Sequence, residues 1–330
     1  MNKVQEAAYK LIQSDARFLY ALTDIMKNAP NIDSNYICMS MPYIGIFADG
    51  AEQWSKKVGL NIPRFNTEEK VYYTQLRQAH KLFGRTYQDF MDLLIMKLNE
   101  SENYFYNIRS LHEKIVGYNN VGTDLCNGEF CGNTILCSMY IPIKTLGNEN
   151  AGIWIKAMSV VAGKLAASFG CKEYPPYSYN ESLTVTYKDY HFYRNSPLKM
   201  DNNLGFLLFS ILCSINYTIE FIESYFLEEI PQKFKFAYLQ YYYLCDFFKE
   251  LNYHINDTIY LDDCLYDRKF RNCLAHYGLG QYINDNEIII DDVLQGLTIK
   301  AFGKDYITTK QALYKLLKEL AHNIKLLILK

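Results

Sequence analysis

Apolar positions recur at helical spacing over several long stretches of the chain. Between Lys3 and Lys27 they return every three or four residues until Asn28-Ala29-Pro30 ends the run, which predicts an amphipathic helix. Asn66-Thr67-Glu68-Glu69 predicts another helix start, because a capping side chain precedes acidic residues in the first turn. The same reasoning predicts helices over residues 67–99 with a bend near Gly84, 102–115, 151–169, 203–228, 231–251, 261–275 and 309–329.

Other segments lack this spacing and favour strands or loops. Tyr36–Phe47 combines β-branched and aromatic residues with Pro42 and Gly45, so it is an irregular strand or a buried loop, and the pattern leaves both open. Residues rich in Gly and Asn predict a loop, alternation predicts strands, and an Asn-Asp-Asn turn predicts a small hairpin. The loop is expected over 117–132, strands over 134–143 and 183–190, an irregular proline-containing stretch over 174–180, and the hairpin over 281–290.

The succession of elements predicts a mainly α fold in two parts. With 330 residues the chain is long enough for two domains. We expect a larger, mostly helical N-terminal region with a few short strands over 1–195, and a helical domain over 196–330. The boundary is placed near Asn195-Ser196-Pro197, where turn-forming residues follow the last expected strand.

One apolar stretch tests whether the chain crosses a membrane. Asn202–Ile219 contains no charge and is long enough for a span. Its asparagines and serines and the acidic residues Asp201 and Glu220 beside it favour instead a buried central helix. The first residues lack the apolar core of a signal peptide, and 9 scattered cysteines are typical of thiols in a reducing compartment. These features predict a cytoplasmic protein without a membrane partner.

Composition limits what the protein can bind. Hydrophobic residues make up 49% of the chain and charged residues 21%, which excludes a disordered chain. The net charge of -2 gives no general attraction to nucleic acid, so any RNA must bind at a local patch. Cys126, Cys131 and Cys137 lack the two-residue gap of a zinc knuckle, so we expect free thiols and no metal.

The segment from Arg271 to His276 carries the clearest chemical signal. Arginine offers a planar fork of donors that matches phosphate oxygens, and histidine can take and give a proton near neutral pH. Asn272 and His276 are four residues apart and would share one helix face, with Arg271 at its edge. Arg268 and Lys269 either add charge for an anionic backbone or form a solvated basic face. A structural role for the whole set, in which the residues satisfy nearby polar groups, is the alternative.

The pattern Arg-Asn-x-x-x-His resembles the signature of the HEPN superfamily, whose members are all-α domains that commonly act as metal-independent RNases. The resemblance implies that His276 deprotonates the ribose 2′-hydroxyl or protonates the leaving 5′-oxygen, that Arg271 stabilises charge on the phosphate, and that Asn272 orients the histidine or contacts phosphate. Arg268, Lys269 and Tyr277 are the expected substrate-binding residues. No cofactor is implied.

The resemblance also implies partners. Two copies of the motif commonly meet across a two-fold axis, so we expect a homodimer with a composite site unless the N-terminal region supplies the second half. Arg77 to His80 and Arg109 to His112 are spaced three apart and lack the following Asn, so neither is a good second copy. The implied role is a toxin or antiphage-defence effector that acts on RNA, with an antitoxin or defence-system partner. The alternatives are a non-catalytic HEPN-like scaffold that binds RNA, nucleotides or protein, and an unrelated helical interaction protein with an accidental motif.

Overall fold

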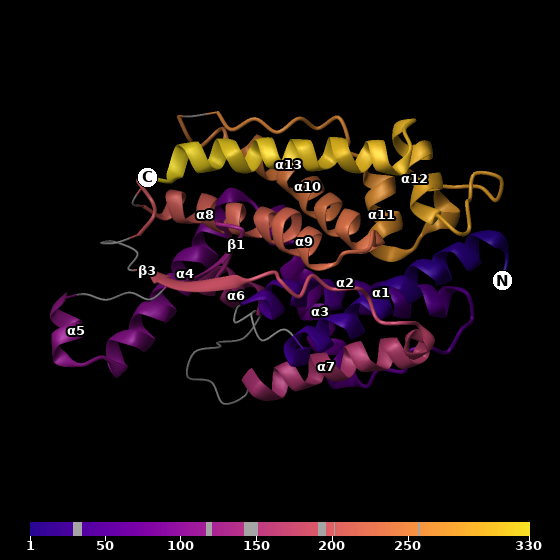
Figure 1. The fold of residues 1–330 in the computed structure, drawn as a ribbon, viewed down its shortest axis with the longest axis horizontal. Helices are drawn as coiled ribbons and strands as arrows, with labels where there is room; N and C mark the ends of the chain where they lie inside the picture. The colour runs from indigo at the N-terminus through magenta and orange to yellow at the C-terminus, as the bar shows by residue number, and fades with distance from the viewer. Residues whose placement is uncertain (29–34, 117–120, 142–150, 191–195, 201, 257) are drawn as a thin grey trace.

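The chain folds into two stacked layers of helices. The computed structural model describes residues 1–28, 35–116, 121–141, 151–190, 196–200, 202–256 and 258–330. The lower layer in Figure 1 holds N-terminal helices, and the upper layer holds C-terminal ones. The lower helices are α1 (Lys3–Asn28), α2 (Tyr36–Lys57), α3 (Thr67–His80) and α7 (Ala151–Ser168), and the upper ones include α8 (Asn203–Asn216), α10 (Pro231–Leu251) and α13 (Tyr306–Ile328). The prediction of a mainly α fold is confirmed.

The helix with the clearest start signal begins where the sequence predicts. Asn66 Oδ1 accepts a hydrogen bond from the Glu69 N–H at 2.8 Å, and Glu69 Oε2 accepts one from the Asn66 N–H at 2.9 Å. These are the two reciprocal hydrogen bonds of a capping box at the start of α3. The bend expected near Gly84 is a full break, with a 3₁₀ turn, η1 (Leu82–Gly84), before α4 (Tyr87–Ile108). The helix expected over 102–115 is divided between α4 and the short α5 (Leu111–Val116), which lies apart from the body in Figure 1.

The prediction of a strand or loop over Tyr36–Phe47 is wrong, because this segment forms the first half of α2. Pro42 lies inside the helix. Helix α2 packs against α1, α3 and α7 and is buried over most of its surface, including Phe47 and Ala51. A helix that is covered on most sides shows no clear amphipathic spacing along the sequence, and its burial outweighs its weak intrinsic propensity.

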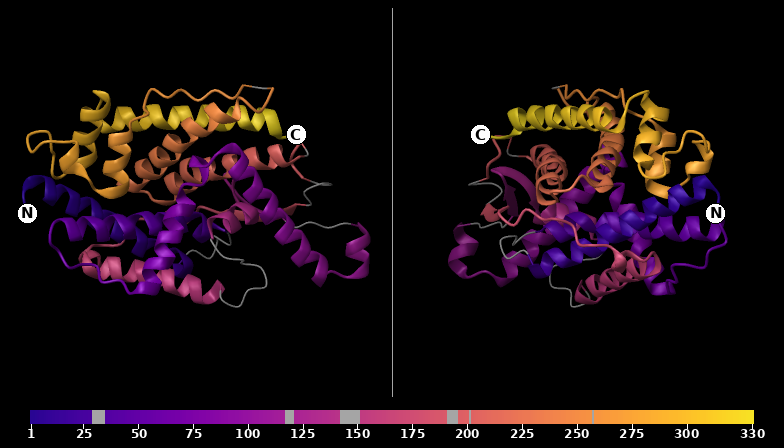
Figure 2. Two further views of the ribbon diagram at one scale, coloured as in Figure 1. Left: turned by 180° about the vertical axis from the view of Figure 1, so that it is seen from behind. Right: turned by 45° about the vertical axis from the view of Figure 1, so that its right-hand side comes forward.

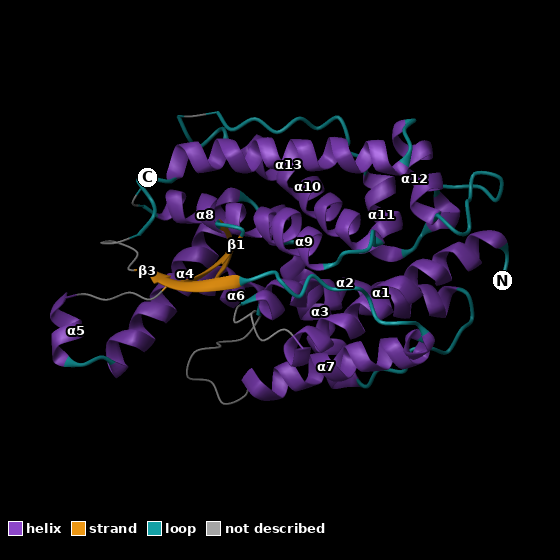
Figure 3. Cartoon of the chain, viewed as in Figure 1, coloured by secondary structure: helices purple, strands orange, loops and turns teal. Residues whose placement is uncertain are grey.

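The prediction of a loop over 117–132 is also wrong for residues 121–132, the part of this range that the structure describes. Strands β1 (Val121–Cys126) and β2 (Glu129–Asn133) form a hairpin whose turn is Asn127-Gly128, with φ of 53° and 80°. Two positive φ values define the turn type that matches strand twist, and Asn-Gly is its preferred pair. The expected strand over 183–190 is confirmed as β3 (Val185–Tyr190), which pairs antiparallel with β1 in a sheet of order β2-β1-β3. Figure 3 shows β1 and β3 in orange among the helices.

Three further predictions in the described residues need correction. The strand expected from Thr134 is α6 (Thr134–Tyr140), since Asn133 Oδ1 accepts the Leu136 N–H at 2.8 Å and starts a helix. The helix expected over 261–275 is shorter, α11 (Arg268–His276). Residues 281–290 form turns and no hairpin, and α12 (Val293–Phe302), which follows them, was not predicted.

The apolar stretch after residue 202 is a buried helix, as expected. It comprises α8, a π-helical turn η3 (Tyr217–Ile222) and α9 (Glu223–Tyr225). By length and composition alone this helix could cross a membrane, yet 94% of its most apolar window is buried inside the fold. It packs on β2 and α13.

Buried apolar side chains from both halves of the sequence form one continuous core. Phe18 of α1 meets Phe236 of α10 edge to face at 5.2 Å, and Tyr43 of α2 stacks on the same ring. The two layers therefore share their interior, and Figure 2 shows the same stacked helices from two further directions. Of the expected boundary at Asn195-Ser196-Pro197, Asn195 and the four residues before it lie outside the described part of the chain.

Candidate functional site

Arg271 and His276 both lie on α11, which is fixed at its two ends. Asp267 accepts the Phe270 N–H at 2.7 Å and starts the helix. Phe270 and Leu274 are fully buried and hold one face against the core. The helix ends after His276 because Tyr277 adopts a left-handed conformation, φ 55° and ψ 27°.

Tyr277 is an unusual residue for a left-handed helix end, where glycine is common. Its side chain is buried, and its hydroxyl donates to Asp15 Oδ2 at 2.6 Å. Asp15 of α1 also accepts from Gln232 at 2.7 Å and pairs with Lys235 of α10. Burial raises the pKa of the Tyr277 hydroxyl, and the Asp15 carboxylate adds to that effect. The Tyr277 hydroxyl, expected to contact substrate, is thus engaged inside the protein and anchors the end of α11.

Helix α2 lies between α3 and α11 and brings them together. A Cβ at Gly50 would lie 2.8 Å from the Ala275 carbonyl oxygen, and a Cβ at Gly45 would collide with the backbone nitrogen of Arg77. Glycine at these two positions lets both neighbouring helices approach the α2 backbone closely. Residues at the C-terminal ends of α3 and α11 consequently line one cavity beside α2.

The two helix ends enclose a small cavity with a basic lining. From α3 and its cap come Arg77, His80 and Lys81, and from α11 come Arg271 and His276. The other lining residues are Ile46, Leu239, Tyr243 and Ala275, and none of the described lining residues is acidic. The Arg77 to His80 segment, which the sequence does not support as a second motif, therefore lies against the predicted one.

One carboxylate lies just outside this cavity. Asp49 Oδ2 is 3.2 Å from Arg77 Nε, close enough for an ion pair, although the N–H is not aimed well enough for a hydrogen bond. Gln53 donates to the same oxygen at 2.8 Å. With Arg77, Lys81 and Arg271 charged and Asp49 ionised, the cluster keeps a net positive charge.

Burial and the nearby cations lower the pKa values of His276, His80 and Lys81. The pKa of His276 falls to about 4, first because of burial and then because Arg77, Arg271 and Lys81 oppose a further positive charge. The pKa of His80 falls to about 3, through burial and then Arg271 and Lys81. The pKa of Lys81 is also lowered, by burial first and next by Arg77 and Arg271. Both histidines are neutral at pH 7, and an anion here would relieve the repulsion.

Two nitrogens at the cavity have neither a hydrogen-bond partner nor an ion-pair partner among the described residues. They are Nε of Arg271 and Nδ1 of His276, and both are buried. The guanidinium carbon of Arg271 lies 4.9 Å from the Tyr242 ring centroid and 5.7 Å from that of Tyr243, which holds it in place. Buried polar atoms are nearly always paired, so these two indicate a binding position. The cavity itself is only about 10 Å³, room for about one water molecule.

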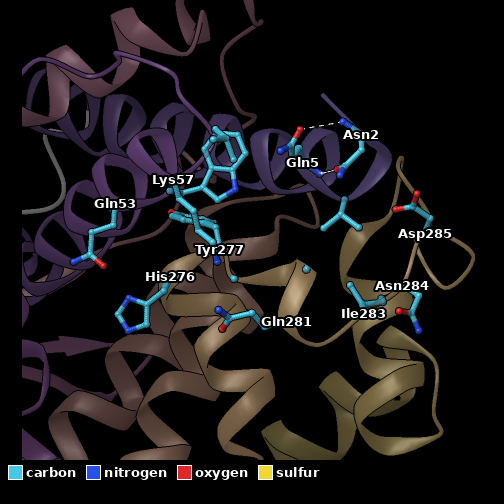
Figure 4. Close-up of a pocket in the computed structure, with 15 residues that line it drawn as sticks. Asn2, Gln5, Gln53, Lys57, His276, Tyr277, Gln281, Ile283, Asn284 and Asp285 are labelled. Atoms are coloured by element: carbon cyan, nitrogen blue, oxygen red, sulfur yellow. Dashed lines mark hydrogen bonds between the residues drawn. The ribbon is translucent and has the colours of Figure 1, made fainter.

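A larger pocket of about 680 Å³ opens on the other side of His276. Figure 4 shows the His276 ring at one end, with Gln53 and Gln281 near it and Asn284 and Asp285 at the other. Residues from α1, α2 and the turn after α11 line this pocket. They are Asn2, Val4, Gln5, Gln53, Trp54, Lys57, Val58, His276, Tyr277, Gly278, Gly280, Gln281, Ile283, Asn284 and Asp285.

The structure brings some of the predicted site residues together and leaves others apart. Arg271 and His276 line one cavity, but Asn272 lines neither, and its side chain makes no hydrogen bond to the described residues. Arg268 and Lys269 are exposed on the first turn of α11 and line neither cavity.

Sequence reasoning rejected Arg77 as part of a second motif and did not single out Lys81. They are four residues apart, and like charges at that spacing repel each other on a helix, a signal that could have marked them as residues with a purpose.

Within the described ranges, His, Cys, Asp and Glu side chains form no group of three or more that could hold a metal ion. Comparison with protein-family models, with curated proteins and with solved structures gave no match. The fold and the site define a two-layered, mainly α protein with a basic cavity between α3 and α11. The HEPN resemblance stays a prediction.

Proposed function

We propose that the protein is a metal-independent endoribonuclease and that its active site is the cavity formed by Arg77, Lys81, Arg271 and His276. One observation carries this proposal: three cations, from α11 and from the end of α3 with its cap, line one cavity with the neutral His276 imidazole, and Arg271 Nε and His276 Nδ1 are buried there without a partner in the described part of the chain. Phosphate oxygens would satisfy both the charge and the unpaired donor of Arg271. A water molecule or a ribose hydroxyl would satisfy the histidine.

The chemistry follows from the protonation state. With a pKa of about 4, His276 is neutral at pH 7 and can accept the proton of a ribose 2′-hydroxyl. The 2′-oxygen then attacks phosphorus, the bond to the 5′-oxygen breaks, and that oxygen is protonated by the imidazolium or by water. The products are a 2′,3′-cyclic phosphate and a 5′-hydroxyl. Arg271, with Arg77 and Lys81, stabilises the charge that builds on the phosphate oxygens.

The size of the cavity limits where the phosphate binds. Room for about one water cannot admit a phosphate group. We infer that the phosphate sits at the mouth of the cavity, beside His276, where the larger pocket opens. The long side chains of Arg77 and Lys81 would turn toward it when RNA binds.

In a two-fold site the second group of basic residues comes from a second subunit, whereas in the proposed site it comes from the same chain. Arg77, His80 and Lys81 stand where a second motif would be expected to contribute, and they come from the same chain. A homodimer therefore remains a prediction that this site does not require. The role as a toxin or antiphage-defence effector, with an antitoxin or defence-system partner, rests on the HEPN resemblance alone.

The test is cleavage of end-labelled single-stranded RNA by the purified protein in EDTA. We expect products with 5′-hydroxyl ends. His276→Ala should lower the rate by about 100- to 10,000-fold and Arg271→Ala by about 100- to 1,000-fold. His322→Ala and Lys315→Ala, on exposed positions of α13, are the matched controls and should cleave as the wild type does.

Two outcomes would contradict the proposal. One is the same rate for the wild type and both cavity variants, which would indicate a contaminating nuclease. The other is RNA binding by the wild type without cleavage, which would support the non-catalytic scaffold. Growth arrest on expression, compared between the wild type and His276→Ala, tests the toxin role separately.

A further inference from the structure

His276 joins two cavities of different chemistry. Among the described residues it is the one side chain that lines both the basic cavity and the larger pocket of about 680 Å³. A ligand whose phosphate is held beside His276 must extend into the larger pocket, because the basic cavity, at about 10 Å³, is too small to take the rest of it. The larger pocket is within the usual size range of small-molecule sites, about 300–1,000 Å³.

The larger pocket is suited to an uncharged, planar group with polar edges. Its lining is rich in amides and apolar side chains and contains the indole of Trp54. Gln281 is exposed, and its amide makes no hydrogen bond to the described residues. Gln53 uses its nitrogen on Asp49, which leaves its oxygen as an acceptor. A side-chain amide offers a donor and an acceptor side by side, the arrangement that pairs with the edge of a nucleobase.

The charges of this pocket do not suit a second phosphate. Lys57 is the only cationic side chain among its described lining residues, and Asp285 lies in the same lining. The cationic side chains that would bind phosphate, Arg77, Lys81 and Arg271, line the basic cavity on the other side of His276.

The two cavities are also linked through one carboxylate oxygen. Asp49 Oδ2 accepts from Gln53 at 2.8 Å and lies 3.2 Å from Arg77 Nε. A group that hydrogen-bonds to Gln53 in the larger pocket would therefore act on Arg77 in the basic cavity.

We propose that the larger pocket is a base-binding subsite for the nucleotide next to the scissile phosphate, with Gln281 reading the base edge and Gln53 assisting. The proposal rests on the proposed ribonuclease function for the placement of the phosphate. The additional claim is that the turn after α11 determines which base is preferred at the cleavage position.

The experiment measures binding and cleavage separately. Binding of AMP, GMP, CMP, UMP and inorganic phosphate is followed by fluorescence in a Trp154→Phe background, which leaves Trp54 as the single tryptophan. Cleavage positions are mapped by sequencing on a random-sequence RNA. Gln281→Leu removes the amide and keeps the volume, and Gln311→Leu, exposed on α13, is the matched control.

We expect one or two of the four nucleotides to bind best. Gln281→Leu should weaken that binding on the order of tenfold, the effect of losing one or two hydrogen bonds, and should flatten the base preference at the cleavage position. Phosphate binding should be the same in Gln281→Leu as in the wild type, because phosphate carries no base. Gln311→Leu should match the wild type in every measurement.

The outcomes separate this proposal from the one on which it rests. If the wild type cleaves RNA but Gln281→Leu keeps its preference and its nucleotide affinities, the base subsite is wrong and the ribonuclease stands. If the wild type binds a nucleotide through Gln281 without cleaving RNA, the subsite stands and the ribonuclease is wrong. Equal binding of all four nucleotides and of phosphate alone would also overturn the subsite.

Discussion

Replacement of Lys235 by methionine should strongly destabilise the protein. Lys235 and Asp15 are 0% and 1% exposed, and the ion pair between them joins α10 to α1. The ammonium also lies 4.7 Å from the Phe47 ring centroid and 5.0 Å from that of Tyr277. Methionine fills most of the lysine volume, so the change removes the charge and leaves Asp15 buried, with Gln232 and Tyr277 as its remaining partners.

The size of the effect follows from the desolvated carboxylate. Loss of one partner of a buried ion pair costs about 3–5 kcal/mol, since the other charge stays buried without compensation. Gln232 and Tyr277 still donate to Asp15, which favours the lower part of that range. Burial lowers the pKa of Lys235 and the nearby Asp15 opposes this shift, so desolvation outweighs attraction even in the intact pair. Asp15→Leu with Lys235→Met should therefore recover much of the loss, as buried pairs replaced by apolar residues often do.

Urea denaturation followed by circular dichroism measures these free energies of unfolding, provided that the m-value is unchanged. The two single variants and the double variant complete a double-mutant cycle with the wild type. The prediction would be refuted if Lys235→Met lowered the free energy of unfolding by less than about 1 kcal/mol, or if the double variant were no more stable than the single variants. Either result would show that the ion pair does not stabilise the contact between the two layers.

Three further predictions concern the site and its supports. The unfolded chain titrates its histidines near pH 6.5, whereas the folded pKa values of His276 and His80 are about 4 and about 3. Between pH 6.5 and 4 the unfolded state therefore binds more protons than the folded state, and the urea midpoint of unfolding should fall as the pH drops through this range. A midpoint that does not change over this range, or that changes equally in the wild type and in His80→Gln, would contradict the burial of neutral histidines. Lys81→Met removes a cation that opposes protonation, so NMR titration should find the pKa of His276 raised toward 6.5, and an unchanged pKa would place Lys81 too far away to act. Gly50→Ala puts a Cβ 2.8 Å from the Ala275 carbonyl oxygen and should cost about 1–3 kcal/mol in urea denaturation, while Gly163→Ala in α7, which has open space, should cost nothing.

Helices with local signals are predictable from the sequence, and those defined by burial are not. The start of α3 follows from Asn66 and Glu69, and α10 begins and ends where Pro231 and the apolar spacing predict. Helix α2 has no such signal, because neighbours cover most of its sides. The β1–β2 hairpin did carry a local signal in Asn127-Gly128, which the surrounding glycines and asparagines obscured.

The candidate site is half predictable for the same reason. Arg271 and His276 are close in sequence, and helical geometry brings them together. Arg77 and Lys81 join them only because α2 carries glycine where α3 and α11 approach it. That contact belongs to the packing of three helices, and no spacing along the chain encodes it. Burial of Tyr277 likewise depends on Asp15, which is on a distant helix.

The origin of the basic cavity in one chain removes a symmetry constraint. Where two identical subunits build a site, each residue occurs twice, and a substitution that suits one position is imposed on the other. Here each group occurs once. Arg77 is tied to Asp49, whereas Arg271 rests on the rings of Tyr242 and Tyr243. The two arginines are thus free to diverge: under the proposed function, Arg77 would respond to the occupant of the larger pocket while Arg271 would hold the phosphate.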